Sequence, residues 1–298
     1  MYKQGLDFIE TIDLQTSSQY SKPLPTGIYK GIDLYFSGAY SSSVDPQDCM
    51  GLLRLKTKRY GDIFSLELPN LQKLNNAFGG LPDSTSGTDF HALVQIPFQI
   101  FGIPNALHIN KSDDFMLYIE KVKTTTTTFK CEVGGVYGME AENYIPVFSQ
   151  DRYTSLGGLQ SEGIGVQNIM GIMMLPTETT EPDLITIETE RYSNSFSHPM
   201  ATYNTDMLFN VESASLGAII IPFVYGSLSD AISGRGNIKF SGGAGYLDYV
   251  VMSAIFDPAR QRKSRGISDQ ERKKRYSEMS SFGVTDRGFS KSALVSGG

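Results

Sequence analysis

The sequence predicts an all-β protein built from sandwiches or jelly rolls. Three observations favour this class: strand-like alternation recurs along the chain, several apolar runs have the length of buried strands, and helical periodicity is rare. The composition agrees, because 16 Tyr, 17 Phe and 30 Gly among 298 residues are typical of sheets joined by many turns. A chain of this length can hold two modules of ordinary size, which is the organisation we expect.

Alternating patterns predict half-buried strands at 28–36, 115–120 and 185–188. In the first of them Ile28 falls on the same face as the apolar residues that follow it, while Tyr29 falls on the opposite face. Successive side chains of a strand point to opposite sides of the sheet. We therefore expect the Ile28 face to lie in the core and the Tyr29 face to lie outside it.

Other runs are apolar on both faces, which predicts strands that are buried between two layers. Pro97 and Pro222 lie inside two of these runs. Because proline has no backbone N–H to donate to a sheet, each should mark a bulge, an edge position or the end of a strand. The four runs are 92–101, 169–175, 216–224 and 246–256.

A short helix is expected between strands of the first half. Asn70 can cap it, Leu71, Leu74 and Phe78 repeat on one face, and a Gly-Gly-Leu-Pro sequence follows. Apart from this segment, strands separated by turn residues show no regular alternation with helices. That pattern argues against a Rossmann or TIM-barrel fold.

Glycines thin the apolar pattern between residues 149 and 165, and we place a boundary near residue 158. The expected organisation is an N-terminal arm at 1–23, a first module at 24–158, a second module at 159–256 and a tail at 257–298. No sequence repeat relates the two modules, so any repetition is architectural.

The tail differs in net charge from residues 1–256, which we call the body. Residues 257–298 carry ten Lys or Arg and five Asp or Glu, about +5, against about −11 for residues 1–256. Part of the tail, 268–279, is compatible with a helix that Ser268 and Glu271 begin as a capping box. The basic residues form two clusters, Arg260, Arg262, Lys263 and Arg265, then Arg272, Lys273, Lys274 and Arg275.

Three interpretations of these clusters stay open. The helix lacks a broad apolar face, so contact with an anionic membrane would be electrostatic, about 1 kcal/mol per basic residue near the surface. The same charges suit the phosphates of nucleic acid. A solvated tail that only promotes solubility is the third interpretation.

No enzyme motif is found. His91, His108 and His198 are isolated, without the spacing of a zinc site, and Cys49 and Cys131 are expected as reduced, partly buried thiols. Walker A, G-x-G-x-x-G and G-x-S-x-G sequences are absent. Glycosidase chemistry needs only two carboxylates, which a sequence alone does not exclude.

No resident cofactor is expected. The alternative to this expectation is a weak calcium site at the acidic turns 113–114 and 178–183, although their spacing matches no known ligand loop. No apolar stretch reaches the roughly 20 residues that cross a bilayer. Acidic residues interrupt the first 14 residues, so we expect neither a signal peptide nor a membrane anchor there.

Residues 24–38, Leu-Pro-Thr-Gly-Ile-Tyr-Lys-Gly-Ile-Asp-Leu-Tyr-Phe-Ser-Gly, carry a family resemblance. The segment resembles the first strand of the double jelly-roll major capsid proteins of corticoviruses. A short helix after the early strands, an Ile-x-x-Ile sequence at 169–172 and a final strand at 245–256 follow in similar order. The tail of about 40 residues after that strand departs from the family pattern.

The resemblance implies a structural protein and not an enzyme. It implies homotrimeric, pseudo-hexagonal capsomers that tile an icosahedral shell around an internal membrane, in the virion of a bacteriophage assembled in the host cytoplasm. Neighbouring capsomers, a vertex or penton protein, and the membrane or its minor proteins would be partners, with calcium sometimes held between capsomers. The basic tail would then turn inward, to the membrane or to nucleic acid.

Two other classes remain as alternatives. A jelly-roll receptor-binding or carbohydrate-binding module would show an exposed aromatic platform, for which a chain rich in Tyr but without Trp offers weak support. A polysaccharide lyase or hydrolase would gather Tyr, His, Arg and carboxylates in a groove. Among capsid components, a vertex or spike protein is a further alternative.

Overall fold

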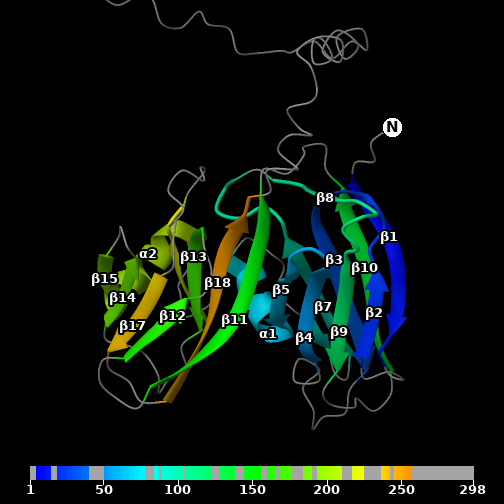
Figure 1. Cartoon of the computed structure of the whole chain (residues 1–298). Coiled ribbons are helices and arrows are strands. Elements are labelled where there is room, and N and C mark those ends of the chain that lie inside the picture. The colour runs from blue at the N-terminus through cyan, green and yellow to red at the C-terminus, as the bar shows by residue number, and fades with distance from the viewer. Residues whose placement is uncertain are drawn as a thin grey trace, which may run out of the picture. The chain divides into compact units, whose positions relative to one another are not determined.

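Eighteen strands and two helices make up the regular structure of the described residues, in accordance with the predicted all-β class (Figure 1). The computed structural model describes residues 5–14, 19–39, 50–77, 84–86, 89–103, 105–121, 128–137, 144–155, 160–164, 168–175, 184–189, 193–209, 217–224, 236–241 and 245–256. The chain divides into two units, Met1–Phe256 and Asp257–Gly298, so the change in composition after Phe256 coincides with the end of the first unit. The second unit lies outside the described residues.

The strands form three sheets, which we name by their positions. The first outer sheet has the order β1 (Gly5–Asp13), β10 (Thr128–Tyr137), β3 (Gly27–Ala39), β7 (Asp89–Pro97), β6 (Ser84–Ser86), with β8 (Leu107–Ile109) also paired to β3. The shared sheet has the order β16 (Ile219–Pro222), β13 (Ile169–Leu175), β18 (Gly245–Ile255), β11 (Ile145–Ser155), β5 (Gly61–Glu67), β4 (Met50–Thr57), β9 (Met116–Lys121), β2 (Gln19–Pro23). The second outer sheet has the order β12 (Gln160–Ile164), β17 (Gly236–Ser241), β14 (Leu184–Thr189), β15 (Ser193–Ser197).

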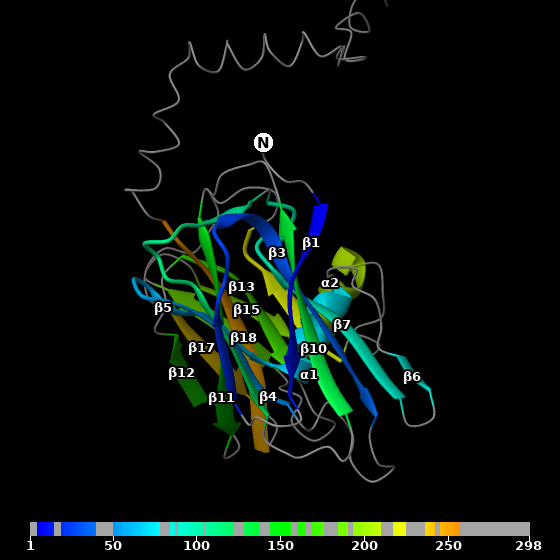
Figure 2. The same ribbon diagram turned by 90° about the vertical axis from the view of Figure 1, so that its right-hand side faces the viewer.

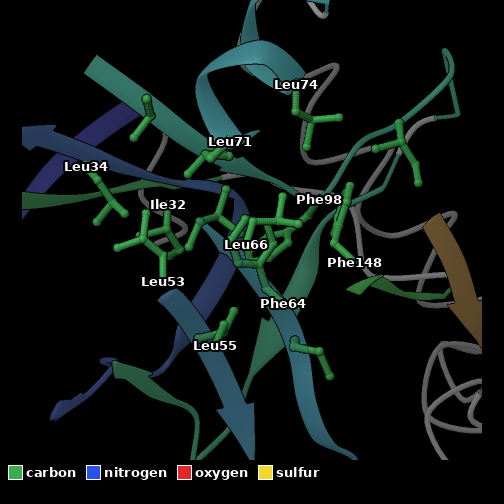
Figure 3. Close-up of a cluster of buried hydrophobic side chains, with 14 of the residues drawn as sticks. Ile32, Leu34, Leu53, Leu55, Phe64, Leu66, Leu71, Leu74, Phe98 and Phe148 are labelled. Atoms are coloured by element: carbon green, nitrogen blue, oxygen red, sulfur yellow. The ribbon is translucent and has the colours of Figure 1, made fainter. Parts of the chain in front are cut away.

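Each outer sheet packs on one half of the shared sheet. Figure 3 shows the first interior, where Ile32 and Leu34 of β3 lie near Leu53 and Leu55 of β4, all fully buried. In the second interior, side chains of β14 pack against β13, β16 and β18. That cluster consists of Ile169, Ile172, Met174, Ile185, Ile187, Ala201, Ile219, Ile221, Leu247, Tyr249 and Val251. The chain therefore forms two sandwiches, as its length and pattern predict.

The two sandwiches are joined inside the shared sheet by β5 and β11. These strands pair in parallel, with Phe64 opposite Phe148 and Ser65 opposite Ser149. The two phenylalanine rings are both buried and lie 5.5 Å apart between centroids. β11 also pairs antiparallel with β18 along its whole length, so this strand, which precedes the expected boundary near residue 158, belongs to the second half of the sheet.

The predicted arm at 1–23 takes part in both layers of the first sandwich. β1 pairs with β10 at the edge of the first outer sheet, and β2 pairs with β9 at the edge of the shared sheet. Ile12 and Leu14 are buried in the core. β1 and β2 are thus integral parts of the sandwich.

The three alternating segments form β3, β9 and β14, with Leu34, Leu117 and Ile185 among the buried residues of their inner faces. The prediction fails at the start of β3, where Tyr29 is fully buried and Ile28 only partly so. The reason is a bulge: the register with β10 shifts next to Tyr29, which moves the preceding residues to the other face. The Tyr29 hydroxyl donates to the carbonyl of Pro25 at 2.8 Å and so holds the turn before the strand.

Burial on both faces is confirmed for β13, where all seven residues are buried, and for the centre of β18. It is wrong for β7, because Leu93 is 41% exposed and His91 and Gln95 on the same face are only partly buried. Pro97 is the last residue of β7, and Pro222 is the last residue of the edge strand β16. Both prolines therefore end strands, as expected.

α1 (Leu68–Ala77) fills the space beside the join of the two sandwiches, and Leu71 and Leu74 are buried there (Figure 3). The helix begins before Asn70, so the prediction that Asn70 caps it is wrong. Pro69 explains the earlier start, because proline suits the first helical turn, where no backbone N–H needs a partner. Phe78 lies outside the described residues.

α2 (His198–Phe209) was not predicted from the sequence. Its start carries a cap, since the Ser197 hydroxyl accepts a hydrogen bond from the backbone N–H of Met200 at 3.4 Å. Pro199 stands in the first turn. The Ser-x-Pro sequence was therefore an available signal, but the weak apolar periodicity after it concealed the helix.

Candidate assembly surfaces

The first and last described strands place the two ends of the body at the same end of the sandwiches. Figures 1 and 2 both show β1 beginning and β18 finishing at the top of the view. We call this the terminal end and the opposite one the far end. Phe256, the residue after β18, is 37% exposed. The last described residue therefore lies at the terminal end, and the tail follows it in the sequence.

The predicted basic residues of the tail all lie outside the described residues. The set is Arg260, Arg262, Lys263, Arg265, Arg272, Lys273, Lys274 and Arg275. The body fixes only the point from which they start. Their contacts with membrane or nucleic acid stay predictions.

At the far end, β11 and β18 carry a cross-strand ion pair. Arg152 Nε lies 2.6 Å from Asp248 Oδ1, and its Nη2 lies 3.0 Å from Oδ2. The hydrogen bonds to Asp248 raise the pKa of Arg152. The same guanidinium lies 5.2 Å from the ring of Tyr246, whose side chain is 59% exposed. The far end thus presents an exposed aromatic ring in contact with a guanidinium that a bidentate salt bridge positions.

The outer face of the first outer sheet carries a polar network. The Tyr35 hydroxyl lies 2.7 Å from His91 Nδ1, and the two rings are stacked. Beside them Gln95 Nε2 donates to Asp33 Oδ1 at 2.6 Å. Burial raises the pKa of Asp33, and the bond from Gln95 opposes that change. Together with Leu93, these partly buried groups form a mixed surface suited to a protein contact.

A third polar group links β1 to β2 at the edge of the first sandwich. Glu10 pairs with Lys22, and the Tyr20 hydroxyl donates to Glu10 Oε2 at 2.8 Å. The bonds from Lys22 and Tyr20 lower the pKa of Glu10, while burial and the bond to Glu10 raise the pKa of Tyr20 to about 12. The group ties the edges of two different sheets together.

The described residues include no group of three His, Cys, Asp or Glu that could hold a metal ion. His91 lies on β7, His108 on β8 and His198 at the start of α2, so the structure does not bring the three histidines onto one element. Asp113 is buried, whereas the acidic segment 178–183 lies outside the described residues. Calcium binding therefore stays a prediction.

Cys131 is a buried free thiol on β10, and burial raises its pKa. A raised pKa keeps the thiol protonated and unreactive, in keeping with the expectation of a buried cysteine. Cys49 lies outside the described residues. Neither of the two helices in the described ranges has the length and apolar character needed to span a bilayer.

No protein-family model and no curated protein matches the sequence. Solved structures do match, and they define the fold: it is the double jelly roll of the major capsid proteins of icosahedral viruses. This confirms the fold that the resemblance at 24–38 predicts. The β3 segment that carries it forms the middle of the first outer sheet.

The neighbours include two structures from Sulfolobus turreted icosahedral virus and one from a bacteriophage. The crystal structure of the STIV major capsid protein has a TM-score of 0.64 at 10% identity and covers 87% of this chain and 98% of that one. The atomic structure of the same virus gives a TM-score of 0.65 at 8% identity, covering 87% and 92%. The major capsid protein P2 from bacteriophage PM2 gives a TM-score of 0.54 at 12% identity, covering 84% and 98%.

Proposed function

We propose that this chain is the major capsid protein of an icosahedral virus and has a structural role instead of an enzymatic one. The observation that carries the proposal is the pair of sandwiches built into one shared sheet, with both ends of the body at one end. Capsid proteins with this fold match over nearly their whole length. The fold thus supports a role as a structural subunit of a capsid.

The block also has a shape suited to tiling. Two similar sandwiches in one chain, repeated three times around a threefold axis, give six similar modules and a near-hexagonal outline. We therefore propose homotrimeric capsomers, which contact one another and a vertex or penton protein in the virion. Assembly in the cytoplasm of a bacterial host belongs to the same proposal.

For the tail we propose a place on the inner side of the shell. It starts from the terminal end, and its two basic clusters suit the anionic surface of an internal membrane, its minor proteins, or nucleic acid. The opposite end would then face outward with its turns. The exposed Tyr246 at the far end would be accessible on that outer side.

A test of the proposed function uses the full-length chain at increasing concentration. Light scattering after gel filtration should give three times the mass of one chain, and negative-stain electron microscopy should show pseudo-hexagonal particles. A chain that stays monomeric at the highest soluble concentration would count against the capsid function. Binding to a glycan array by such a monomer would favour the carbohydrate-binding alternative.

A further inference from the structure

α2 exposes an apolar stripe on the side that faces away from the second sandwich. Met200, Tyr203 and Met207 are 53%, 62% and 67% exposed, and their spacing places them on one helix face. Ala201 and Thr205, on the opposite face, are buried against β16. A contiguous apolar surface of this kind commonly marks an interaction site.

A pocket of about 420 Å³ lies beside the stripe, between α2 and the edge strand β16. Met207 belongs to both the stripe and the pocket. The pocket is lined by Asn204, Met207, Leu208, Ile220, Ile221 and Pro222. A protruding apolar side chain of a partner could fill this hollow while the stripe covers its surroundings.

The position of the stripe favours a second copy of the chain as the partner. β16 and β2 are the two edges of the shared sheet, and Figure 1 shows α2 and β2 on opposite sides of the body. In a closed threefold ring the contacts are head-to-tail, so a patch on one side of each copy meets a different patch on the other side of the next copy. The stripe and the β2 edge have this relation.

Charge is compatible with the same pairing. α2 contains one acidic residue, Asp206, and no Lys or Arg. The β2 edge carries Lys22, whose side chain is 44% exposed, together with the exposed Ser21 and Pro23. Lys22 is paired there with Glu10, so the helix that carries Asp206 would meet an edge of mixed charge and not a uniformly acidic surface.

We propose that the α2 stripe, Met200, Tyr203 and Met207 with the adjoining pocket, forms one half of the contact between neighbouring copies, and that the β2 edge of the next copy forms the other half. The inference rests on the proposed trimer and adds the surface through which it closes.

The first test removes the apolar surface without touching the core. A Tyr203→Ser, Met207→Ser double variant should raise the dissociation constant of the trimer at least tenfold, measured by sedimentation equilibrium. Tyr246→Ser is the matched control, because Tyr246 has nearly the same exposure, 59%, but lies on β18. Circular dichroism spectra should be unchanged in both variants, and so should the thermal midpoint measured at concentrations at which the chain is monomeric, since the altered side chains are exposed.

The second test identifies the partner surface by cross-linking. In a Cys49→Ser background, Tyr203→Cys combined with Ser21→Cys should give covalent dimers and trimers with a short bismaleimide. Tyr246→Cys combined with Ser21→Cys should give none. Cross-linking that is equal in both pairs, or absent in both while the chain is trimeric, would overturn the inference.

The outcomes distinguish a failure of the α2 contact from a failure of the proposed capsid function. A wild-type chain that never forms trimers contradicts the proposed function. If the wild-type chain forms trimers and the double variant forms them with equal affinity, only the α2 contact is contradicted. The proposed capsid function is then unaffected.

Discussion

Asn75 occupies the place of a neighbouring strand beside Gln95. Its side-chain carbonyl accepts a hydrogen bond from the backbone N–H of Gln95 at 2.7 Å, and its amide donates to the carbonyl of the same residue at 2.8 Å. In the second sandwich the Thr205 hydroxyl of α2 likewise accepts from the backbone N–H of Ile220 at 2.9 Å. Each sandwich thus uses a helical side chain to satisfy the backbone of a strand that has no paired strand there among the described residues.

Asn75→Ala should destabilise the chain by about 1–3 kcal/mol, because a backbone N–H and carbonyl of β7 lose their partner in a partly buried place. Urea unfolding followed by circular dichroism measures the change. Asn204→Ala is the control, since Asn204 is an exposed asparagine in the other helix. An equal effect of the two substitutions would contradict the role given to Asn75.

Gly171→Ala should cost about 1–3 kcal/mol through overpacking. A Cβ at this position of β13 would lie 2.7 Å from ring atoms of Phe101 and 3.1 Å from the carbonyl oxygen of Ile221. Adding Phe101→Leu to the variant should recover part of the loss. Leucine removes the ring atoms that meet the new Cβ, whereas the backbone carbonyl of Ile221 stays in place. No recovery in thermal unfolding would mean that the ring is not the obstacle.

The alkaline limit of stability should depend on Tyr20. Its pKa in the folded chain is about 12, above the ordinary value near 10, so the protonated hydroxyl stabilises the fold fully below pH 10 and this contribution is lost as pH rises through 12. The loss should be on the order of 1 kcal/mol after solvent screening. Tyr20→Phe should show a smaller fall in stability between pH 10 and 12 than the wild type, as measured by urea unfolding.

The Glu10 carboxylate makes the stability of the fold depend on pH in acid. Its pKa is lowered, so its contribution is present above the pKa of the unfolded chain and is lost as pH falls through the folded value. Glu10→Gln should therefore flatten the decline of stability in acid. The Tyr20→Phe variant distinguishes the acid effect from the alkaline effect on stability. It removes the alkaline effect and retains the Lys22 partner of Glu10.

Deleting residues 260–298 should leave trimers intact and weaken association with anionic liposomes. The difference from the full chain should shrink as salt rises, because screening already suppresses the contact. Co-sedimentation with phosphatidylserine vesicles at low and high salt measures both effects. Equal binding of the two chains to vesicles at low salt would exclude the membrane role of the tail. Retention of nucleic acid by the full chain alone would favour nucleic acid as the partner of the tail.

Most of the fold could be predicted from the sequence where burial follows a simple period. Leu34, Leu117 and Ile185 follow the period of two in strands with one face in the core, and β13 has both faces buried. The exceptions come from long-range structure. Tyr29 is buried because a bulge in its pairing with β10 shifts the period, and no local signal reports such a shift.

The candidate surfaces were less accessible to sequence reasoning. Arg152 and Asp248 are 96 residues apart in the chain, so only the pairing of β11 with β18 brings them together. α2 was missed because its outer stripe of Met and Tyr blurs the apolar period that normally identifies a helix. The tail clusters were evident from composition alone, since a run of basic residues needs no tertiary partner to be recognised.

The parallel pairing of β5 with β11 has a mechanical consequence. Phe64 and Phe148 share one buried cluster, and Gln150 accepts a further hydrogen bond from the backbone N–H of Glu67, so the sandwiches cannot turn about each other without breaking the sheet. A shell assembled from such stiff tiles has to bend at the seams between copies. Its diameter would then be decided by the angles at those seams and by proteins that occupy them, while every tile keeps the same internal shape.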